Sequence, residues 1–404
     1  MAVKPLGVGL IGSGMISVTY LENMIQRFGI LNVVGCSDLI EERAKSKAEE
    51  FGIKYMTNEE IFSSKEIDIV VNTTYPLSHH LINKQALEAG KHVHCEKMMA
   101  CGFEEAQDQY NMAKSKNLRL GMAPDTFLGG GLQTARKLID DGYIGKPLIV
   151  HSIVMRNYAA ASPTNPDMPS MVLNKGGTIP FDMGGYYIHA MINMFGPIKR
   201  VSGSAKADEI KFSHPLNPLY GQKVEYTDDP TTMVAVLEFE SGVIGCLTAC
   251  SQSQFGAVYP GITVYGTEAA IKCPDPNTFG GPVTIVKGGG FGAGGIEIAE
   301  HNIPLTHGYT GEERSFGPEP TNQIRRMFAS SRRGIGVADM AWAIRNNRPH
   351  RCSAEMGLHA IEVVHGAVQA AKTGQYYNMT TTCERPAALP TGFLGPDAEA
   401  CLDN

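Results

Sequence analysis

The sequence lacks the features that mark several large classes of protein. It has no run of about 18 apolar residues, so no segment is expected to span a membrane. Its 35 lysines and arginines are outnumbered by 41 aspartates and glutamates, and the net charge of −6 argues against binding to nucleic acid or a membrane surface. Its nine cysteines are odd in number and form no Cys-x-x-Cys pair, and the N-terminus has no leader-like pattern. These absences predict a soluble, cytoplasmic protein with reduced thiols.

Glycine, by contrast, is abundant: there are 45 in 404 residues, about 11% where about 7% is usual. Some of these glycines fall beside predicted helices, with Gly90 just after one and Gly184 and Gly185 at the start of another. The densest stretch, Gly280–Gly295, lies next to no catalytic candidate and is expected to be an irregular, flexible surface hairpin. The length predicts about two to three domains.

Short apolar runs and helical patterns alternate from residue 6 to residue 123. Parallel strands need crossover connections, which are usually helices, so this alternation is typical of a doubly wound parallel sheet of the Rossmann kind. We therefore expect residues 1–123 to form one α/β domain. The expected strands are Leu6–Ile11, Asn32–Ser37, Ile67–Asn72, Lys91–Cys95 and Arg119–Met122, and the expected helices are Met15–Phe28, Glu41–Phe51, Ser78–Ala89 and Phe103–Lys116.

Beyond residue 123 the predicted strands lose their intervening helices. Thr232–Glu240 and Val243–Cys250 are separated by Ser241-Gly242, which is typical of an antiparallel hairpin. Residues 124–404 are therefore predicted to form an α+β domain with a large, mainly antiparallel, open-faced sheet, whose late helices can return to the first domain. The other expected strands are Pro147–Arg156, Ile198–Ser204, Gly261–Gly266 and Ala269–Cys273; the expected helices are Gly131–Asp141, Tyr186–Phe195, Gly336–Arg345 and Glu355–Thr373; and Tyr158–Gly177 is expected to be irregular.

A glycine-rich turn follows the first strand and opens the first helix, with the sequence Gly12-Ser13-Gly14-Met15-Ile16-Ser17. In such a turn the first glycine permits a tight bend, the second lets a pyrophosphate approach the backbone, and the helix N-terminus offers N–H donors. Ser17 replaces the third glycine of the usual pattern. Asp38 ends the second strand, 24 residues after Gly14, where a carboxylate binds a ribose diol and repels a 2′-phosphate. The turn therefore predicts a dinucleotide cofactor, with NAD favoured over NADP.

Two further motifs stand at the ends of later strands, where ligands bind in open α/β sheets. They are Thr74-Tyr75-Pro76-Leu77-Ser78-His79 and Gly90-Lys91-His92-Val93-His94-Cys95-Glu96-Lys97. With the glycine turn, these motifs resemble the Gfo/Idh/MocA (glucose–fructose oxidoreductase / inositol dehydrogenase) family. The resemblance continues over nearly the whole chain, through Gly176-Gly177, Asp182-Met183-Gly184 and Tyr265-Gly266-Thr267-Glu268. It implies that Thr74, Tyr75 and His79 flank the cofactor and that Glu96 and Lys97 bridge cofactor and substrate.

Lys97 matches the catalytic-site cation of the Glu-Lys-Pro motif of that family. Oxidation of an alcohol requires removal of the hydroxyl proton and stabilisation of the developing alkoxide, and a buried lysine beside a carboxylate can do both. The proline that follows the lysine in the family is Met98 here. Because a cis peptide before a residue other than proline costs about 3–4 kcal/mol, we expect a trans peptide, or a strained substitute, at this position.

A third cluster is expected on one helix face, because Asp182 and Tyr186 are four residues apart and Tyr186 and His189 are three apart. The resemblance places Tyr186 at the family's histidine and His189 at its second carboxylate. His189 is therefore the second acid–base candidate, with Asp182 and Tyr186 positioning hydroxyl groups. Arg156 and Tyr158, at the end of a strand, are candidates for contact with substrate. The twelve histidines show no metal-ligand spacing, so no metal site is expected.

The resemblance implies an NAD(H)-dependent dehydrogenase that oxidises a secondary hydroxyl group of a carbohydrate, with Lys97 and His189 assisting as acid and base. The favoured group is the 3-hydroxyl of a pyranose or of the sugar of a glycoside, and this choice rests on analogy. Two alternatives stay open: a redox-neutral, NAD-dependent enzyme that cleaves a glycoside, and a sensor that binds NAD(H) without catalysis. The open sheet face is expected to pair between subunits in a homodimer or homotetramer.

Overall fold

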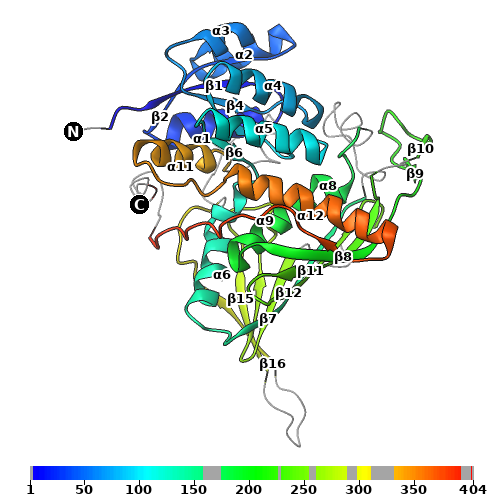
Figure 1. The fold of residues 1–404 in the computed structure, drawn as a ribbon. Helices are drawn as coiled ribbons and strands as arrows, with labels where there is room; N and C mark the ends of the chain where they lie inside the picture. Colours follow the sequence, from blue (N-terminus) through cyan, green and yellow to red (C-terminus); the bar gives the residue numbers. More distant parts are fainter. Residues whose placement is uncertain are drawn as a thin grey trace, which may run out of the picture.

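The computed structural model describes residues 3–157, 174–225, 229–253, 261–288, 298–310, 332–392 and 402 of the chain. These residues form two large sheets, and helices lie between them (Figure 1). Tyr158 and most of the segment predicted to be irregular after it fall outside the described residues. The candidate site lies where the two sheets and their helices meet.

The first sheet consists of six parallel strands in the order β3-β2-β1-β4-β5-β6. Every residue of β1 and β4 is buried, as expected for strands that helices cover on both faces. The strand order reverses between β1 and β4, and ligands of open α/β sheets bind at the carboxyl ends of strands at such a point. The predicted doubly wound sheet is confirmed. Its strands are β1 Leu6–Ile11, β2 Leu31–Ser37, β3 Lys54–Tyr55, β4 Ile69–Asn72, β5 His92–Cys95 and β6 Leu120–Met122.

Local sequence signals explain where the helices of this domain begin and end. Gly52 ends α2 in the left-handed region with φ 66°, and Pro76 occupies the first turn of α4, where its missing N–H costs nothing. Thr57 and Glu60 form a capping box that starts α3, a helix too short to show in the periodicity of the sequence. The helices are α1 Ser17–Arg27, α2 Glu41–Phe51, α3 Asn58–Ser63, α4 Pro76–Glu88 and α5 Phe103–Ser115.

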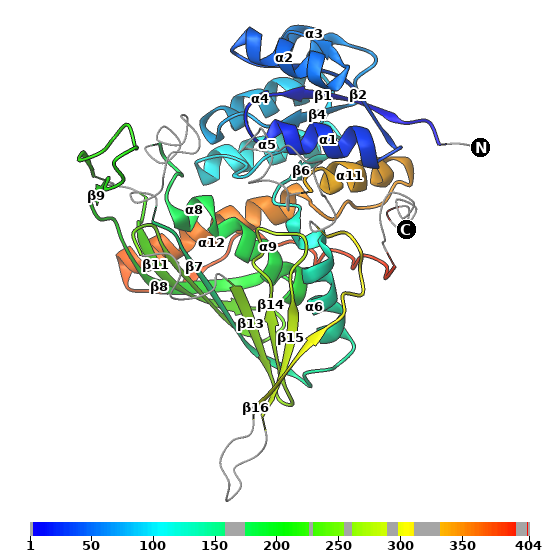
Figure 2. The ribbon, with the colours of Figure 1, turned by 180° about the vertical axis from the view of Figure 1, so that it is seen from behind.

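The second sheet has nine strands in the order β16-β15-β14-β13-β7-β12-β11-β8-β17. Among the described strands of this sheet only β7 and β12 pair in parallel, which confirms the mainly antiparallel sheet. Helices cover the face turned toward the first domain, and the opposite face is open (Figure 2). The strands are β7 Pro147–Met155, β8 Ile198–Lys206, β11 Thr232–Phe239, β12 Ile244–Cys250, β13 Gly261–Gly266, β14 Ala270–Cys273, β15 Val283–Gly288, β16 Ile298–Ile303 and β17 Tyr377–Asn378; β9 Ile210–Lys211 and β10 Lys223–Val224 form a separate pair.

The glycine-dense stretch Gly280–Gly295 is more regular than expected. Val283–Gly288 is strand β15, which pairs antiparallel with β16, Ile298–Ile303. The expectation of an irregular segment is therefore wrong for Val283–Gly288, whereas the antiparallel pairing of β15 with β16 agrees with the expected hairpin. Alternating burial along Val283, Thr284 and Ile285 fixes the strand, and the neighbouring glycines obscured this short pattern. The connection between the two strands falls outside the described residues.

Helices from late in the chain fill the space between the two sheets (Figures 1 and 2). Helix α12 packs against β8 of the second sheet and against α5 and β6 of the first domain. Gly357 permits this close approach, since a Cβ atom there would lie 2.5 Å from Met122 Cγ. None of the helices in the described ranges combines the length and apolar character needed to cross a bilayer. The helices of this half are η1 Thr126–Leu128 (3₁₀), α6 Gly130–Asp140, α8 Ile179–Asp182, α9 Gly184–Phe195, α11 Ile335–Arg345 and α12 Ala354–Thr373.

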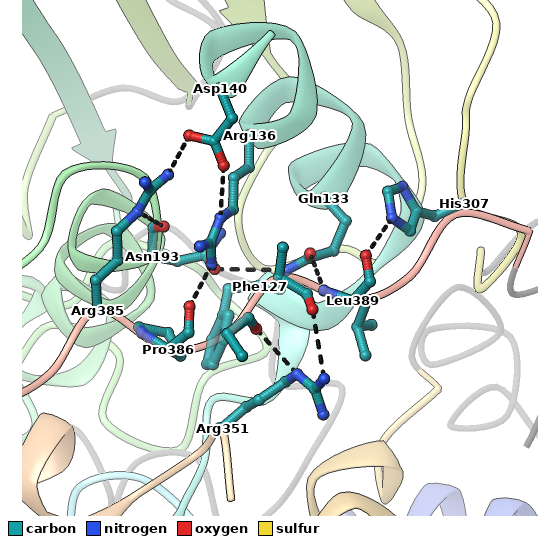
Figure 3. A network of polar contacts seen from close by, with 12 residues as sticks. Phe127, Gln133, Arg136, Asp140, Asn193, His307, Arg351, Arg385, Pro386 and Leu389 are labelled. Atoms are coloured by element: carbon teal, nitrogen blue, oxygen red, sulfur yellow. Dashed lines mark hydrogen bonds and ion pairs between the residues drawn. The ribbon is translucent and has the colours of Figure 1, made fainter. Parts of the chain in front are cut away.

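A polar network ties the segment after β17 to helices α6 and α9 (Figure 3). Arg136 Nη1 donates hydrogen bonds to Asn193 Oδ1 (2.8 Å) and to the carbonyl oxygen of Pro386 (2.6 Å). Arg385 donates to the Asn193 carbonyl oxygen (3.0 Å) and pairs with Asp140. Most of these groups are removed from water, so their mutual satisfaction stabilises one arrangement of the helices. The network therefore fixes the C-terminal end of α9, the helix that carries Tyr186 and His189.

Candidate active site

The glycine turn after β1 has the geometry of a phosphate cradle. Gly12 has φ 101°, and a Cβ atom there would lie 2.6 Å from the backbone nitrogen of Thr74, so only glycine fits. A Cβ atom on Gly14 would meet no protein atom within 4 Å, so the space above it is open to a ligand. No side chain caps the N-terminus of α1, and the positive end of a helix dipole attracts an anion. The residues present fit the pyrophosphate of a dinucleotide.

Asp38 lies beside this turn, at the end of β2. One oxygen of its carboxylate accepts a hydrogen bond from the N–H of Ser13 (2.7 Å), and the other accepts one from the N–H of Ile40 (2.8 Å). The Ser13 hydroxyl donates to the carbonyl oxygen of Ser37 (3.0 Å), which links the turn to β2. The structure thus brings Asp38 together with the glycine turn.

The motif after β4 is organised by a buried histidine. His79 Nε2 lies 2.9 Å from the carbonyl oxygen of Thr74, and Nδ1 lies within hydrogen-bond distance of the carbonyl oxygen of Met98. Burial lowers the pKa of His79, although these two backbone carbonyls oppose the effect. His79 therefore joins the loops after β4 and β5 from within, whereas Tyr75 is exposed beside the same loop.

The peptide bond between Lys97 and Met98 is cis, so the expectation of a trans peptide is wrong. That expectation considered the bond in isolation, whereas Met98 is buried and its carbonyl oxygen is held by His79. The preceding carboxylate of Glu96 is also buried, and it accepts hydrogen bonds from the Tyr20 hydroxyl (2.8 Å) and from the N–H of Lys97 (3.0 Å). The backbone that presents Lys97 is therefore held on both sides.

Lys97 forms an ion pair with Asp182 across the two domains. Burial by itself would lower the pKa of Lys97, but the carboxylate of Asp182, with Tyr186 and Glu96, outweighs it and raises the pKa above its usual value. Lys97 is therefore an ammonium group that can donate hydrogen bonds or stabilise negative charge. Its Nζ lies 5.6 Å from the centre of the Tyr186 ring, so the three predicted residues Lys97, Asp182 and Tyr186 come together.

Asp182 and Tyr186 do not share one continuous helix as expected. Asp182 ends the short helix α8, and α9 begins at Gly184 after the intervening Met183. The helix is interrupted at Met183, whose φ is −108°, and the i, i+4 spacing alone did not reveal this. Asp182, at the end of α8, forms its ion pair with Lys97 at this break between the two helices.

His189 lies in different surroundings from Tyr186. It is buried, its ring centre is 6.2 Å from that of Phe127, and it hydrogen-bonds with the backbone of Pro124. Burial lowers the pKa of His189 to about 4, so the ring is neutral near pH 7. Among the described residues no hydrogen bond or ion pair joins His189 to Lys97 or Asp182.

Arg333 is a site residue that the sequence patterns did not indicate. It is buried just before α11, and its Nη2 donates a 2.8 Å hydrogen bond to the Tyr186 hydroxyl. Its Nη1 lies 3.6 Å from a carboxylate oxygen of Asp125, which is also buried. Since Arg333 follows Tyr186 by 147 residues, no local spacing could connect them.

The structure gives less information on the two predicted substrate-contact residues, Arg156 and Tyr158. Arg156 pairs with Asp275 at 3.3 Å near the end of β7, and Tyr158 lies outside the described residues. Within the described ranges no group of three or more histidine, cysteine, aspartate or glutamate side chains is arranged to hold a metal ion.

Comparison with protein families identifies the class. Residues 6–123 match the model described as "Oxidoreductase family, NAD-binding Rossmann fold", and residues 132–272 match the "GFO/IDH/MocA C-terminal domain". The fold and the matches together define an oxidoreductase with a nucleotide-binding Rossmann domain. More particularly, the chain belongs to the Gfo/Idh/MocA oxidoreductase family.

Curated relatives match over part of their length. The chain is 31% identical over 154 residues to an uncharacterized oxidoreductase of Schizosaccharomyces pombe, a match that covers 38% of this chain and 41% of that protein. A second uncharacterized oxidoreductase of the same yeast is matched over 56% of its length. Inositol 2-dehydrogenase 3 of Saccharopolyspora erythraea is 26% identical over 280 residues, which are 68% of this chain and 75% of that protein.

Solved structures share the fold over nearly the whole chain. Levoglucosan dehydrogenase in complex with NADH has a TM-score of 0.73 at 20% identity, with 94% of this chain and 100% of that chain covered. An aldose–aldose oxidoreductase from Caulobacter crescentus complexed with glycerol has a TM-score of 0.69 at 18% identity, with 93% and 100% covered. At these identities the likeness shows the fold alone.

Proposed function

We propose that this protein is an NAD(H)-dependent dehydrogenase that oxidises a secondary hydroxyl group of a sugar, polyol or glycoside. The observation that carries the proposal is the ammonium group of Lys97, which is paired with Asp182 and adjacent to Tyr186 at the carboxyl edge of the parallel sheet. A cation there is useful to a reaction in which an oxygen becomes negatively charged. The finer choice, the 3-hydroxyl of a pyranose, follows from the resemblance and belongs to the same proposal.

Each residue of this cluster has a part that its chemistry allows. The Lys97 ammonium donates a hydrogen bond to the reacting hydroxyl oxygen and stabilises the alkoxide as the proton leaves. The Asp182 carboxylate keeps Lys97 charged and orients it, and both side chains are shielded from water. Of the predicted acid–base pair Lys97 and His189, Lys97 is held as an ammonium group, so the hydroxyl proton passes to His189 or to Tyr186, whose ring lies beside Lys97. NAD⁺, when bound, accepts the hydride from the carbon that carries the hydroxyl group.

The choice of NAD over NADP rests on the Asp38 carboxylate. It lies beside the glycine turn, where it would accept hydrogen bonds from a ribose diol and repel a 2′-phosphate. The hydrogen bond that this carboxylate accepts from the Ser13 N–H fixes its orientation. This assignment is independent of which sugar is oxidised.

The open face of the second sheet supports a homodimer or homotetramer. Apolar side chains are exposed on neighbouring strands of this face, including Ile149, Val236 and Ile244, and Ile149 and Ile244 are direct partners in the pairing of β7 with β12. Large exposed apolar patches mark sites of association. Light scattering after size exclusion measures the molar mass of the wild-type protein and of Val236→Glu, and so tests whether this face forms a subunit interface. A monomeric wild type rules out the proposed oligomer.

The dehydrogenase proposal is tested with a substrate panel. Purified protein is incubated with NAD⁺ or NADP⁺ and with myo-inositol, levoglucosan, D-glucose or an alkyl glucoside, and NADH formation is followed by absorbance while products are identified by mass. The expected result is a ketone product and stoichiometric NADH from at least one compound. Release of an aglycone without net NADH would replace the proposal with a redox-neutral glycoside cleavage. Cofactor binding with no turnover of any compound would favour a sensor.

A further inference from the structure

A buried arginine contacts the active-site tyrosine from an element far along the chain. Arg333 is 3% exposed and its Nη2 donates hydrogen bonds to the Tyr186 hydroxyl (2.8 Å) and to Asn277 Oδ1 (3.1 Å). The centre of its guanidinium lies 5.2 Å from the centre of the Tyr186 ring. The contact therefore engages both the hydroxyl and the face of the same side chain.

The arginine is itself held by a buried carboxylate. Asp125 lies just after β6, and one of its oxygens is 3.6 Å from Arg333 Nη1. Its other oxygen accepts hydrogen bonds from the N–H groups of Gly334 (2.9 Å) and Gly336 (3.1 Å). Asp125 thus fixes both the guanidinium charge and the turn of backbone that carries it. A group held in this way is preorganised, because its side chain loses little freedom when a ligand binds.

The chemistry of the two groups sets the direction of the hydrogen bond. A guanidinium has only donors, so the Tyr186 oxygen must accept from Arg333 and its own O–H is directed elsewhere. Within the described part of the chain no acceptor receives that O–H. Lys97, whose Nζ is 5.6 Å from the Tyr186 ring centre, also has only donors. The phenol proton is therefore available to a ligand in the site that Lys97 shares.

We propose that Arg333 is a positioning residue for proton transfer through Tyr186. It holds the phenol oxygen by a charge-assisted hydrogen bond and leaves the other side of that oxygen to exchange a proton with the substrate hydroxyl. During oxidation the O–H bond of the substrate breaks and its proton goes to the Tyr186 phenolate. The C–H bonding pair leaves as hydride to NAD⁺, and the carbon–oxygen bond becomes a carbonyl. The transfers of the substrate proton and of the hydride rest on the proposed dehydrogenase function, whereas the hydrogen bond from Arg333 to Tyr186 does not.

The charges around Tyr186 define the effect expected of Arg333. Burial raises the pKa of the Tyr186 hydroxyl above its usual value, and the positive charges of Arg333 and Lys97 offset only part of this rise. The carboxylates of Glu96 and Asp182 act in the same direction as burial. Since Arg333 makes the direct hydrogen bond, its removal is expected to raise the pKa of Tyr186 further, and the phenolate would become scarcer at any given pH.

The first experiment needs no substrate. The protein is labelled with 3-fluorotyrosine, whose phenol is more acidic than that of tyrosine, and each phenol is titrated by ¹⁹F NMR, with Tyr186→Phe identifying the Tyr186 resonance. Arg333→Gln is expected to raise the Tyr186 midpoint by about 1–2 pH units, the usual effect of a lost charge-assisted hydrogen bond. The matched control is Arg332→Gln, the adjacent buried arginine, whose guanidinium lies 5.9 Å from the centre of the Tyr309 ring and is not one of the main charges that shift the pKa of Tyr186. It should leave the midpoint unchanged.

An unchanged Tyr186 midpoint in Arg333→Gln overturns the assignment. Should that variant not fold, Arg333→Lys takes its place, because lysine keeps the charge but not the planar fork. A smaller rise of the midpoint is then expected, and no rise again overturns the assignment.

The second experiment separates this inference from the proposed function. The second measurement is kcat/KM as a function of pH, with a compound that is oxidised in the substrate panel. In Arg333→Gln the midpoint of the ascending limb should move to higher pH by the same number of pH units as the NMR midpoint, and in Arg332→Gln it should not move. A limb that does not move, with only a lower kcat, makes Arg333 a structural residue and overturns the inference. A shifted NMR midpoint in a protein that oxidises none of the compounds supports the role of Arg333 and refutes the dehydrogenase.

Discussion

Replacement of Lys97 by methionine removes the charge of the Lys97–Asp182 pair while keeping much of the side-chain volume. The two side chains are 17% and 16% exposed, so Asp182 would be left largely buried without its partner. Breaking a buried pair from one side costs about 3–5 kcal/mol, and the residual exposure points to the lower end of that range. The cost falls on the charged form of the buried carboxylate, so the loss of stability is expected to be smaller at low pH than at high pH.

The assay is urea unfolding of Lys97→Met, Lys97→Met/Asp182→Asn and the wild type at pH 5 and pH 8. We expect the single variant to lose more stability at pH 8 than at pH 5, and the double variant to recover most of the loss at pH 8. Turnover should fall at least about 100-fold in both variants, because neither restores a cation, while affinity for NAD measured by calorimetry persists. The reasoning is refuted if the single variant keeps more than about a tenth of the turnover, or if the double variant is as unstable as the single one at pH 8.

Three further outcomes are expected. Gly12→Ala should lower the free energy of unfolding by at least about 1–3 kcal/mol, because Gly12 has a φ of 101°. Gly14→Ala should keep its stability and lose affinity for the cofactor, because a Cβ atom at Gly14 meets no protein atom within 4 Å. Equal stabilities of the two variants would contradict this geometry. Asp38→Ala should narrow the preference for NAD over NADP in kcat/KM, and an unchanged ratio would exclude Asp38 as its cause. Tyr186→Phe should abolish the ascending limb of the pH–rate profile, whereas His189→Gln should keep that limb; the reverse result would make His189 the acid–base group.

The fold of the first domain could be predicted because its signals are local. Apolar runs, helix caps and the turn at Gly12 each lie within a few residues, and β1, α2 and β5 begin within about a residue or two of the expected positions. The two-residue strand β3 and six-residue helix α3 escaped detection because each is too short for a repeated pattern of apolar residues to be recognised. In the second domain the strand β15 was hidden by the glycines around it.

The site was predictable only where its residues belong to motifs. Lys97 and Asp182 were selected from separate motifs, and the structure brings them into contact. Arg333 could not be found in this way, because it meets Tyr186 across 147 residues and Asp125 reaches Gly334 across 209. Such contacts depend on how α11 returns to the first domain, which the periodicity of a single segment does not encode. A pair of adjacent arginines before a glycine and a helix is otherwise typical of an exposed helix start.

The contrast between Tyr186 and His189 shows how one helix can serve two purposes. Three residues of helix advance about 4.5 Å, enough to move from the cations of the site into the packing around η1. Tyr186 contacts Arg333 and lies beside Lys97, and these two positive charges offset part of the rise in the pKa of its hydroxyl that burial and nearby carboxylates cause. The pKa of His189 is lowered to about 4 by burial, so this ring is a weak base that sits against Phe127. A proton leaving a substrate hydroxyl is stabilised better by a base whose negative charge is compensated than by a neutral ring whose positive charge would be buried. These surroundings favour the proposed role of Tyr186 in proton exchange over such a role for His189.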